Sequence, residues 1–125
     1  MRILLDTHIY LWWLEDHIKL SSKARELIQS ADEVYISSAS IWEAAIKISI
    51  GKLEADVSAL AQQISLNGFI ELPVSAKHAV QIAQLPNHHR DPFDRMLVAQ
   101  AMTEPLRLLS ADAQVAQYSE LVDLV

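Results

Sequence analysis

Residues 3–8 read Ile-Leu-Leu-Asp-Thr-His, so an apolar, strand-like run ends in an acid directly before a helix-like segment. Three further acids occupy comparable places, at the ends of apolar runs or at the starts of helical segments: Glu43, Asp94 and Asp112. Strands that alternate with helices form parallel sheets, and the carboxyl ends of parallel strands share one edge, where ligands of open α/β folds bind. The sequence therefore predicts that Asp6 and these three acids surround one crevice.

The spacing of apolar and capping residues predicts an α/β chain in which helices separate nearly all the strands. Strands are expected at about residues 2–5, 34–37, 69–72, 107–109 and 122–124. Helices are expected at about residues 7–14, 21–30, 38–50, 56–66, 75–84, 92–103 and 113–118. Gly51 stands in the C′ position that glycine favours, and Pro92 stands at the first helical position. The sheet should be mostly parallel, with helices on both of its faces.

The composition indicates one globular domain over residues 1–125. A chain that is 51% hydrophobic with only 2 Gly and 4 Pro is helix-rich and not disordered. The absence of cysteine excludes disulfides and thiolate metal sites. The formal net charge of -6 argues against broad electrostatic attraction to nucleic acid, although two bound divalent ions would add four positive charges at one spot.

The N-terminus does not read as a targeting segment. The acid at position 6 interrupts any secretory apolar region, and no apolar run approaches the roughly 20 residues of a membrane span. We therefore expect a cytoplasmic protein with no membrane partner.

A cluster of carboxylates needs a neutralising charge. Two unpaired carboxylates about 5 Å apart repel by roughly 3 kcal/mol at an effective dielectric constant of about 20. Carboxylate oxygens suit hard divalent cations, and the histidines of the chain show no spacing typical of a zinc site. A crevice lined by four acids therefore predicts a site for Mg²⁺ or Mn²⁺.

Each acid also has a purely structural interpretation. Asp6 and Asp112 can act as N-caps of the helices that follow them. Glu43 can close a capping box with Ser40, or it can pair with Lys47 at i,i+4. Capping and metal binding are compatible, since a helix N-terminus can steady a carboxylate that binds an ion.

The segment Asp-Pro-Phe-Asp-Arg at residues 91–95 has similar alternatives. Asp91 is the natural N-cap ahead of Pro92, which makes Asp94 a third-position acid favoured by the helix dipole. Arg95 can contact a phosphate, or it can pair with Asp91 at i,i+4.

Around these residues the chain closely resembles the PIN-domain nucleases, in particular the VapC-type toxins of bacterial and archaeal toxin–antitoxin pairs. The resemblance covers residues 3 to about 118. It rests on the motifs ILLDTHIYLWW, SSASIWEAAIKISIGKL, HHRDPFDRMLVAQA and LLSADAQVAQY. Four acids in order, with these flanking residues, make the signal specific.

The resemblance implies a three-layer α/β/α fold and metal-dependent, selective cleavage of RNA. It assigns catalysis and the binding of Mg²⁺ or Mn²⁺ to four residues: Asp6, Glu43, Asp94 and Asp112. We take Asp6 and Asp94 as direct ligands, and the other two as ligands that bind directly or through water. Asp91 is interpreted as a cap or an outer residue of the site. Many relatives carry Asn where this chain has His8, which weakens any role for that side chain.

Several residues near the predicted crevice have two interpretations. Ser110 and Thr7 can orient metal-bound water or substrate, or they can simply begin a helix. The His-His-Arg loop at residues 88–90 can contact RNA or remain solvated. Trp12 and Trp13 cannot both face the core of a short helix, so we expect one in the core and the other at an interface.

The leading interpretation is a toxin ribonuclease that cleaves RNA, forms a homodimer and is held inactive by a cognate antitoxin that covers the acidic site. A related interpretation is an RNA-processing nuclease without an antitoxin. A receiver-like regulatory module with an acidic Mg²⁺ pocket is a third, but such a module needs a late Lys and none follows Lys77. A catalytically dead interaction domain is discounted because all four acids are present.

Overall fold

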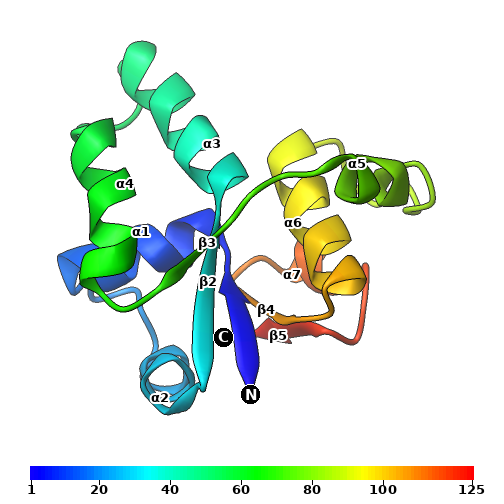
Figure 1. The fold of residues 1–125 in the computed structure, drawn as a ribbon, viewed down its shortest axis with the longest axis horizontal. Helices are drawn as coiled ribbons and strands as arrows, with labels where there is room; N and C mark the ends of the chain where they lie inside the picture. Colours follow the sequence, from blue (N-terminus) through cyan, green and yellow to red (C-terminus); the bar gives the residue numbers. More distant parts are fainter.

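The computed structural model describes residues 1–125 and contains a five-stranded sheet between layers of helices (Figure 1). The strands are β1 (Arg2–Leu5), β2 (Glu33–Ser37), β3 (Ile70–Leu72), β4 (Arg107–Ser110) and β5 (Val122–Leu124). The helices are α1 (Thr7–Glu15), α2 (Ser22–Ser30), α3 (Ser38–Ser49), α4 (Val57–Leu66), α5 (Ala76–Ile82), α6 (Pro92–Thr103) and α7 (Ala113–Ala116). Every strand pairing is parallel, in the order β3-β2-β1-β4-β5. The expected α/β/α fold with a mostly parallel sheet is confirmed, and no strand is antiparallel.

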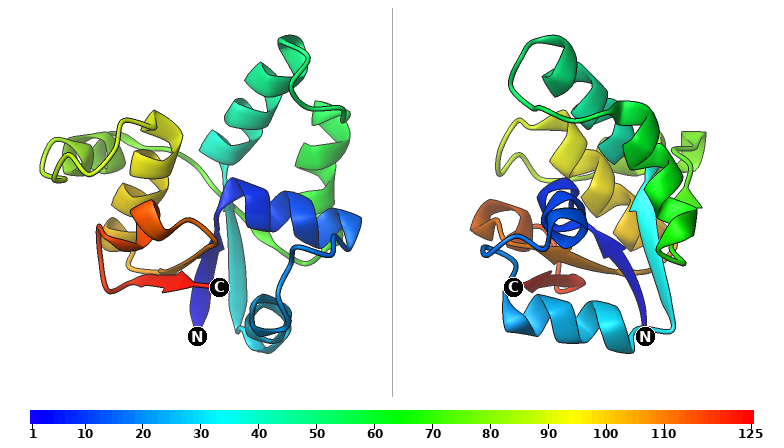
Figure 2. Two further views of the ribbon diagram at one scale, coloured as in Figure 1. Left: turned by 180° about the vertical axis from the view of Figure 1, so that it is seen from behind. Right: turned by 90° about the vertical axis from the view of Figure 1, so that its left-hand side faces the viewer.

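The sheet has a hydrophobic core on each face, because successive side chains of a strand point to opposite sides. Ile3 and Leu5 of β1 belong to the core under α1, α2 and α4, whereas Leu4 belongs to the core under α6 and α7. Figures 1 and 2 show these helices on either side of the sheet. All three side chains are 0% exposed, as expected for a central strand that is covered on both faces.

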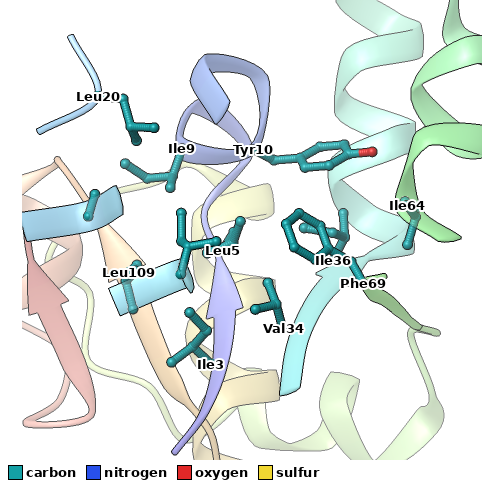
Figure 3. Close-up of a cluster of buried hydrophobic side chains, with 12 residues drawn as sticks. Ile3, Leu5, Ile9, Tyr10, Leu20, Val34, Ile36, Ile64, Phe69 and Leu109 are labelled. Atoms are coloured by element: carbon teal, nitrogen blue, oxygen red, sulfur yellow. The ribbon is translucent and has the colours of Figure 1, made fainter. Parts of the chain in front are cut away.

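Figure 3 shows the first of these cores, in which aromatic side chains from separate elements meet. The ring of Phe69 lies 6.3 Å from that of Tyr10 and 5.9 Å from that of Trp13, measured between centroids. The Tyr10 hydroxyl donates a 2.7 Å hydrogen bond to the Leu60 carbonyl of α4. This bond satisfies a buried polar atom and fixes α1, the helix that follows Asp6, against α4.

Every element boundary lies within two residues of the expected one. Helix α5 ends at Ile82 instead of residue 84, because tight turns at residues 83–85 lead into Pro86, which has no N–H to donate. Helix α7 ends at Ala116 instead of residue 118, and Tyr118 is buried against the second core. None of the helices has the length and apolar character needed to cross a membrane.

The strand order places a topological switch point beside β1. The chain proceeds outward through β2 and β3 on one side of β1, and β4 and β5 follow on the other side. In open α/β sheets, ligands bind outside the carboxyl ends of the strands at such a point. Asp6 directly follows β1 and Ser110 ends β4, so both residues stand at this position.

Gly51 closes α3 in the left-handed conformation, with a φ of +76°. A Cβ at this position would meet nothing within 4 Å, so a side chain costs backbone strain and not crowding. We expect Gly51→Ala to lower the free energy of unfolding by about 1 kcal/mol, and Gly51→Asn by less, because Asn tolerates this conformation better. Urea unfolding measures both variants, and equal costs for Ala and Asn would contradict the conformational explanation.

Candidate active site

A pocket of about 560 Å³ opens at the carboxyl ends of the central strands. Its lining includes all four predicted acids together with the extra acid of the sequence analysis: Asp6, Glu43, Asp91, Asp94 and Asp112. They come from β1–α1, α3, α6 and the start of α7, which lie far apart along the chain. The expectation that these acids surround one crevice is met, and we call this cavity the acidic pocket.

Asp6 is the most deeply placed of the acids that were predicted to bind metal, with 5% of its surface exposed. It stands at the N-cap position of α1, but its side chain makes no capping hydrogen bond. Instead its Oδ2 accepts a 2.7 Å hydrogen bond from the Ser110 hydroxyl. Burial raises the pKa of Asp6, and the bond from Ser110 opposes that rise. The interpretation of the Asp6 side chain as a simple cap is therefore wrong.

The two hydroxyl residues at the switch point bond within the protein. The Ser110 hydroxyl, besides donating to Asp6, accepts a 3.1 Å hydrogen bond from the Asp112 N–H at the turn into α7. The Thr7 hydroxyl donates a 2.8 Å hydrogen bond to the Ser40 hydroxyl of α3. Ser110 therefore orients a carboxylate of the pocket, and Thr7 joins α1 to α3.

We expect Ser110→Ala to lower the free energy of unfolding of the metal-free protein by about 1–3 kcal/mol, because the buried Asp6 carboxylate loses a donor. The matched control is Ser49→Ala, which removes an exposed hydroxyl that bonds the Ile46 carbonyl. The control should change stability by no more than about 0.5 kcal/mol. Urea unfolding in EDTA compares the two variants. Equally small effects would show that Asp6 does not depend on Ser110.

Glu43 lies on α3 with 6% of its surface exposed. The helix begins at Ser38, and its cap is Ser37, whose hydroxyl accepts a 3.0 Å hydrogen bond from the Ala39 N–H. Ser40 is therefore inside the helix, and the proposed capping box with Glu43 is wrong. The alternative pair at i,i+4 is confirmed, since the Lys47 amine lies 2.9 Å from the Glu43 carboxylate.

The start of α6 follows the expected pattern at its acids but not at its arginine. Asp91 caps the helix by accepting hydrogen bonds from the N–H groups of Phe93, at 2.9 Å, and Asp94, at 3.1 Å. The expected ion pair between Arg95 and Asp91 is wrong. The Arg95 guanidinium instead donates to the Tyr118 hydroxyl at 3.0 Å and to the Pro86 carbonyl at 2.9 Å.

Asp94 is held by a histidine of the preceding loop. The Nε2 of His89 lies 3.1 Å from Oδ2 of Asp94, and its Nδ1 lies 2.8 Å from the Tyr118 hydroxyl. Burial, and after it the negative charges of Asp6 and Asp91, raise the pKa of Asp94 to about 7. His88 also packs edge-on against Tyr118, at 4.9 Å between centroids. The interpretation of the His-His-Arg loop as merely solvated is therefore wrong for His89, whereas His88 remains exposed.

Asp112 is the most exposed of the four predicted ligands and acts as the N-cap of α7. Its Oδ1 accepts a 2.8 Å hydrogen bond from the Gln114 N–H. The capping interpretation is thus confirmed for Asp112, and it leaves the second carboxylate oxygen free of this bond. The residue also lines the acidic pocket, so capping and a place in the site coexist here.

The acids of the pocket do not form a ready-made metal site, because no group of three or more His, Asp or Glu side chains is arranged to hold an ion. Each predicted ligand instead has a protein donor: Ser110 for Asp6, Lys47 for Glu43, His89 for Asp94 and the Gln114 N–H for Asp112. The oxygen-only donor set and the crowding of negative charge nevertheless fit a hard divalent cation. Such an ion would compete with Lys47 and His89 for their carboxylates.

Comparison with known proteins decides the family, since the PIN domain family matches residues 3–121. The chain belongs to the PIN-domain family. Among curated proteins it is 25% identical over 118 residues to Ribonuclease VapC22 of Mycobacterium tuberculosis, an alignment that covers 93% of this chain and 91% of that protein. Family membership sets aside the receiver-like module considered from the sequence.

Several solved structures share the fold of this PIN domain. VapBC2 from Rickettsia felis, bound to a DNA fragment from its promoter, is similar with a TM-score of 0.73 and 18% identity over 98% of both chains. A toxin–antitoxin complex from Klebsiella pneumoniae has a TM-score of 0.67 and 15% identity over 97% of this chain and 95% of that one. FitAcB from Neisseria gonorrhoeae has a TM-score of 0.64 and 19% identity over 96% and 95%. At these identities the likeness shows the fold.

Some residues of the PIN domain take places that the sequence analysis missed. Trp12 and Trp13 are both partly buried against the first core, so the expected division between core and interface is wrong. The prominently exposed tryptophan is Trp42 of α3, with 63% of its surface accessible. Lys19 joins Lys47 in the lining of the acidic pocket. The i,i+4 spacing between Glu43 and Lys47 indicated that Lys47 lies near the site, whereas no local pattern indicates this for Lys19.

Proposed function

We propose that this PIN domain is a metal-dependent endoribonuclease whose Mg²⁺ or Mn²⁺ is held in the acidic pocket. The observation that carries the proposal is the convergence of five carboxylates at the topological switch point of a parallel sheet. Similarity to a ribonuclease of the same family supports RNA as the substrate. We also propose that the protein acts in the cytoplasm, where it would meet RNA.

The residues of the pocket have separate tasks under this proposal. Asp6 and Asp94 would hold the cation directly, and Glu43 and Asp112 would hold it directly or through water. The bound cation supplies a positive charge that orients the scissile phosphate and lowers the pKa of a water. Ser110 and His89 fix the orientation of Asp6 and Asp94 through the hydrogen bonds described above.

Lys47 places a positive charge at the wall of the pocket. Its amine is bonded to Glu43 at 2.9 Å, and its side chain is about one-third exposed. Lys47 also lines the acidic pocket, so its amine stands beside the space in which a phosphate would lie. Lys47 is therefore expected to aid the binding of the RNA backbone.

The direct test is the incubation of the purified protein with total RNA in Mn²⁺, in Mg²⁺ and in excess EDTA. We expect discrete fragments with either ion and no cleavage in EDTA. Restoration of the fragments by Mn²⁺ added after the chelator excludes irreversible damage as the cause. Full activity in excess EDTA would contradict the metal-dependent mechanism.

We further propose that the protein is the toxin of a toxin–antitoxin pair, with a small antitoxin as its partner. Its support is the similarity to Ribonuclease VapC22 and to proteins solved as toxin–antitoxin complexes. Co-expression with the short gene next to its own should yield a complex that does not cleave RNA. A protein that has no such neighbour, and that cleaves freely in its host, would instead be a processing nuclease.

The proposal also includes a homodimer. Helix α3 and its C-cap residue expose an apolar stripe at i, i+4 and i+8, formed by Trp42, Ile46 and Ile50. The stripe borders an apolar pocket of about 340 Å³ between α3 and α6, where Trp42 packs edge-on against Phe93. An exposed patch of this kind is typical of an interface. Light scattering should give the mass of a dimer, and a monodisperse monomer would contradict this part.

A further inference from the structure

A second pocket opens directly beside the acidic pocket. It has a volume of about 350 Å³ and shares His8, Trp12 and Lys47 with the acidic pocket. Its other walls come from α1, the residues just after it and the turn that follows α3. We call this cavity the flanking pocket. Because the two cavities have a common border, they offer one continuous path to a chain molecule.

One wall of the flanking pocket is aromatic. His8 and Trp12 lie one helical turn apart on α1, with ring centroids 6.0 Å apart. Trp12 and His17 stack, with centroids 6.0 Å apart and ring planes inclined by 25°. Trp12 is only partly buried against the first core and lines both pockets, so part of its ring is held in place while another part stays accessible. A ring fixed in this way offers a stacking surface at a low entropic cost.

The facing wall carries positive charge. Lys47 lies on α3 and Lys52 in the turn after it, and the Lys52 N–H donates a 2.8 Å hydrogen bond to the Lys47 carbonyl. Lys52 is exposed and belongs to none of the ion pairs of the structure. The flanking pocket contains one acid, Glu15, whereas the acidic pocket contains five. The local charge therefore changes sign from one pocket to the next.

We propose that the flanking pocket binds one nucleotide of single-stranded RNA next to the scissile phosphate. The base stacks on Trp12 and the phosphate lies against Lys52. An aromatic surface beside a positive groove is the arrangement by which proteins bind unpaired nucleic acid. This inference rests on the proposed ribonuclease function and adds to it a nucleotide subsite formed by Trp12 and Lys52.

The positive charge of the flanking pocket explains how a chain with a negative net charge can still attract RNA. A chain with a formal charge of -6 attracts RNA poorly as a whole. Here the lysines are concentrated on the path by which a strand leaves the acidic pocket, so the attraction acts where the substrate lies. A base paired in a duplex cannot stack on Trp12, and the site consequently selects single strands.

The test separates binding from cleavage. A labelled single-stranded oligoribonucleotide is titrated with the full chain carrying Asp94→Asn, which removes cleavage and one negative charge. In this background Trp12→Ala should weaken binding by about 5-fold to 100-fold, as expected for the loss of one stacked base. Trp12→Phe should restore most of the affinity. Lys52→Ala should weaken binding several-fold and reduce its dependence on salt.

Two controls keep the result interpretable. Lys23→Ala removes an exposed lysine of α2 that lines neither pocket, and it should leave the affinity unchanged. Lys52 is exposed, so Lys52→Ala tests the inference even if Trp12→Ala proves unstable in a thermal melt. In the cleaving chain, Lys52→Ala should raise the KM for RNA and leave kcat nearly unchanged.

The outcomes distinguish this inference from the function on which it rests. A parent chain that neither binds nor cleaves RNA overturns both. A parent chain that cleaves RNA, together with Trp12→Ala and Lys52→Ala variants of parental affinity, overturns the inference alone. Variants that keep RNA affinity but lose the antitoxin would assign the flanking pocket to a polypeptide, and would likewise overturn it.

Discussion

Asp6→Asn is expected to slow RNA cleavage by at least about 100-fold while the chain stays folded. Asn has nearly the same shape as Asp, and its amide oxygen can still accept the hydrogen bond from Ser110. No capping bond is lost, because the Asp6 side chain makes none. The substitution removes the negative charge that would hold the cation, and the loss of one such electrostatic group costs about 10²–10³ in rate. Cleavage rates in Mn²⁺ and a thermal melt measure the two properties.

The matched control for this prediction is Asp56→Asn. Asp56 caps α4 through the N–H groups of Ser58 and Ala59, and it lies outside the acidic pocket. Asn is about as good a cap as Asp, so this variant should cleave RNA and melt as the parent does. If Asp6→Asn behaves in the same way as Asp56→Asn, the acid after β1 has no part in the chemistry.

The second expected result is that Asp94 lowers the free energy of unfolding of the metal-free protein as the pH rises from about 4 to about 7, a contribution that is absent in Asp94→Asn. The pKa of Asp94 rises from 3.8 to about 7 in the folded chain, with burial as the largest cause. Across this window the unfolded chain has lost the proton that the folded chain still binds. The contribution of Asp94 to the free energy of unfolding therefore decreases with pH in the window, and above about pH 7 the loss is complete.

The difference between parent and Asp94→Asn cancels the titrating groups that are distant from this carboxyl, and it leaves Asp94 together with Asp6 and Asp91, whose charges interact with it. Glu104, for example, has a pKa lowered chiefly by its hydrogen bond with His78, so its contribution has the opposite sign. We expect the stability of the parent relative to the variant to fall by up to about 4 kcal/mol across the window. Urea unfolding in EDTA at several pH values gives this difference. A difference that does not change with pH would contradict the raised pKa.

Much of the fold follows from local pattern. The runs that became β1 and β5 and the helix Pro92–Thr103 have the expected bounds, because period-two and period-3.6 spacing and a proline at N1 are local properties. Alternation of strands with helices predicts that the strands pair in parallel, but it does not determine which strands are neighbours in the sheet. Helix α7 ends before Tyr118, whose hydroxyl bonds to His89 of a distant loop and to Arg95 of α6, contacts that no local pattern indicates.

In the candidate site, too, some features follow from the sequence and others depend on contacts between distant residues. The places of Asp6, Glu43, Asp94 and Asp112 around one pocket follow from topology, since each stands near a strand end or a helix start. Their partners follow from sequence only where the contact is local, as for Glu43 with Lys47. The contact of Asp94 with His89 depends on how a loop folds, and the contact of Asp6 with Ser110 spans 104 positions.

The binding of a divalent cation in the acidic pocket can be tested by counting the Mn²⁺ ions bound per chain. Electron paramagnetic resonance of free Mn²⁺, in a titration against the metal-free protein, counts the bound ions without any RNA. We expect at least one bound Mn²⁺ per parent chain. Binding should be strongly weakened in the double variant that carries both Asp6→Asn and Asp94→Asn. A parent chain that cleaves RNA yet binds no Mn²⁺ at millimolar concentration would contradict this expectation.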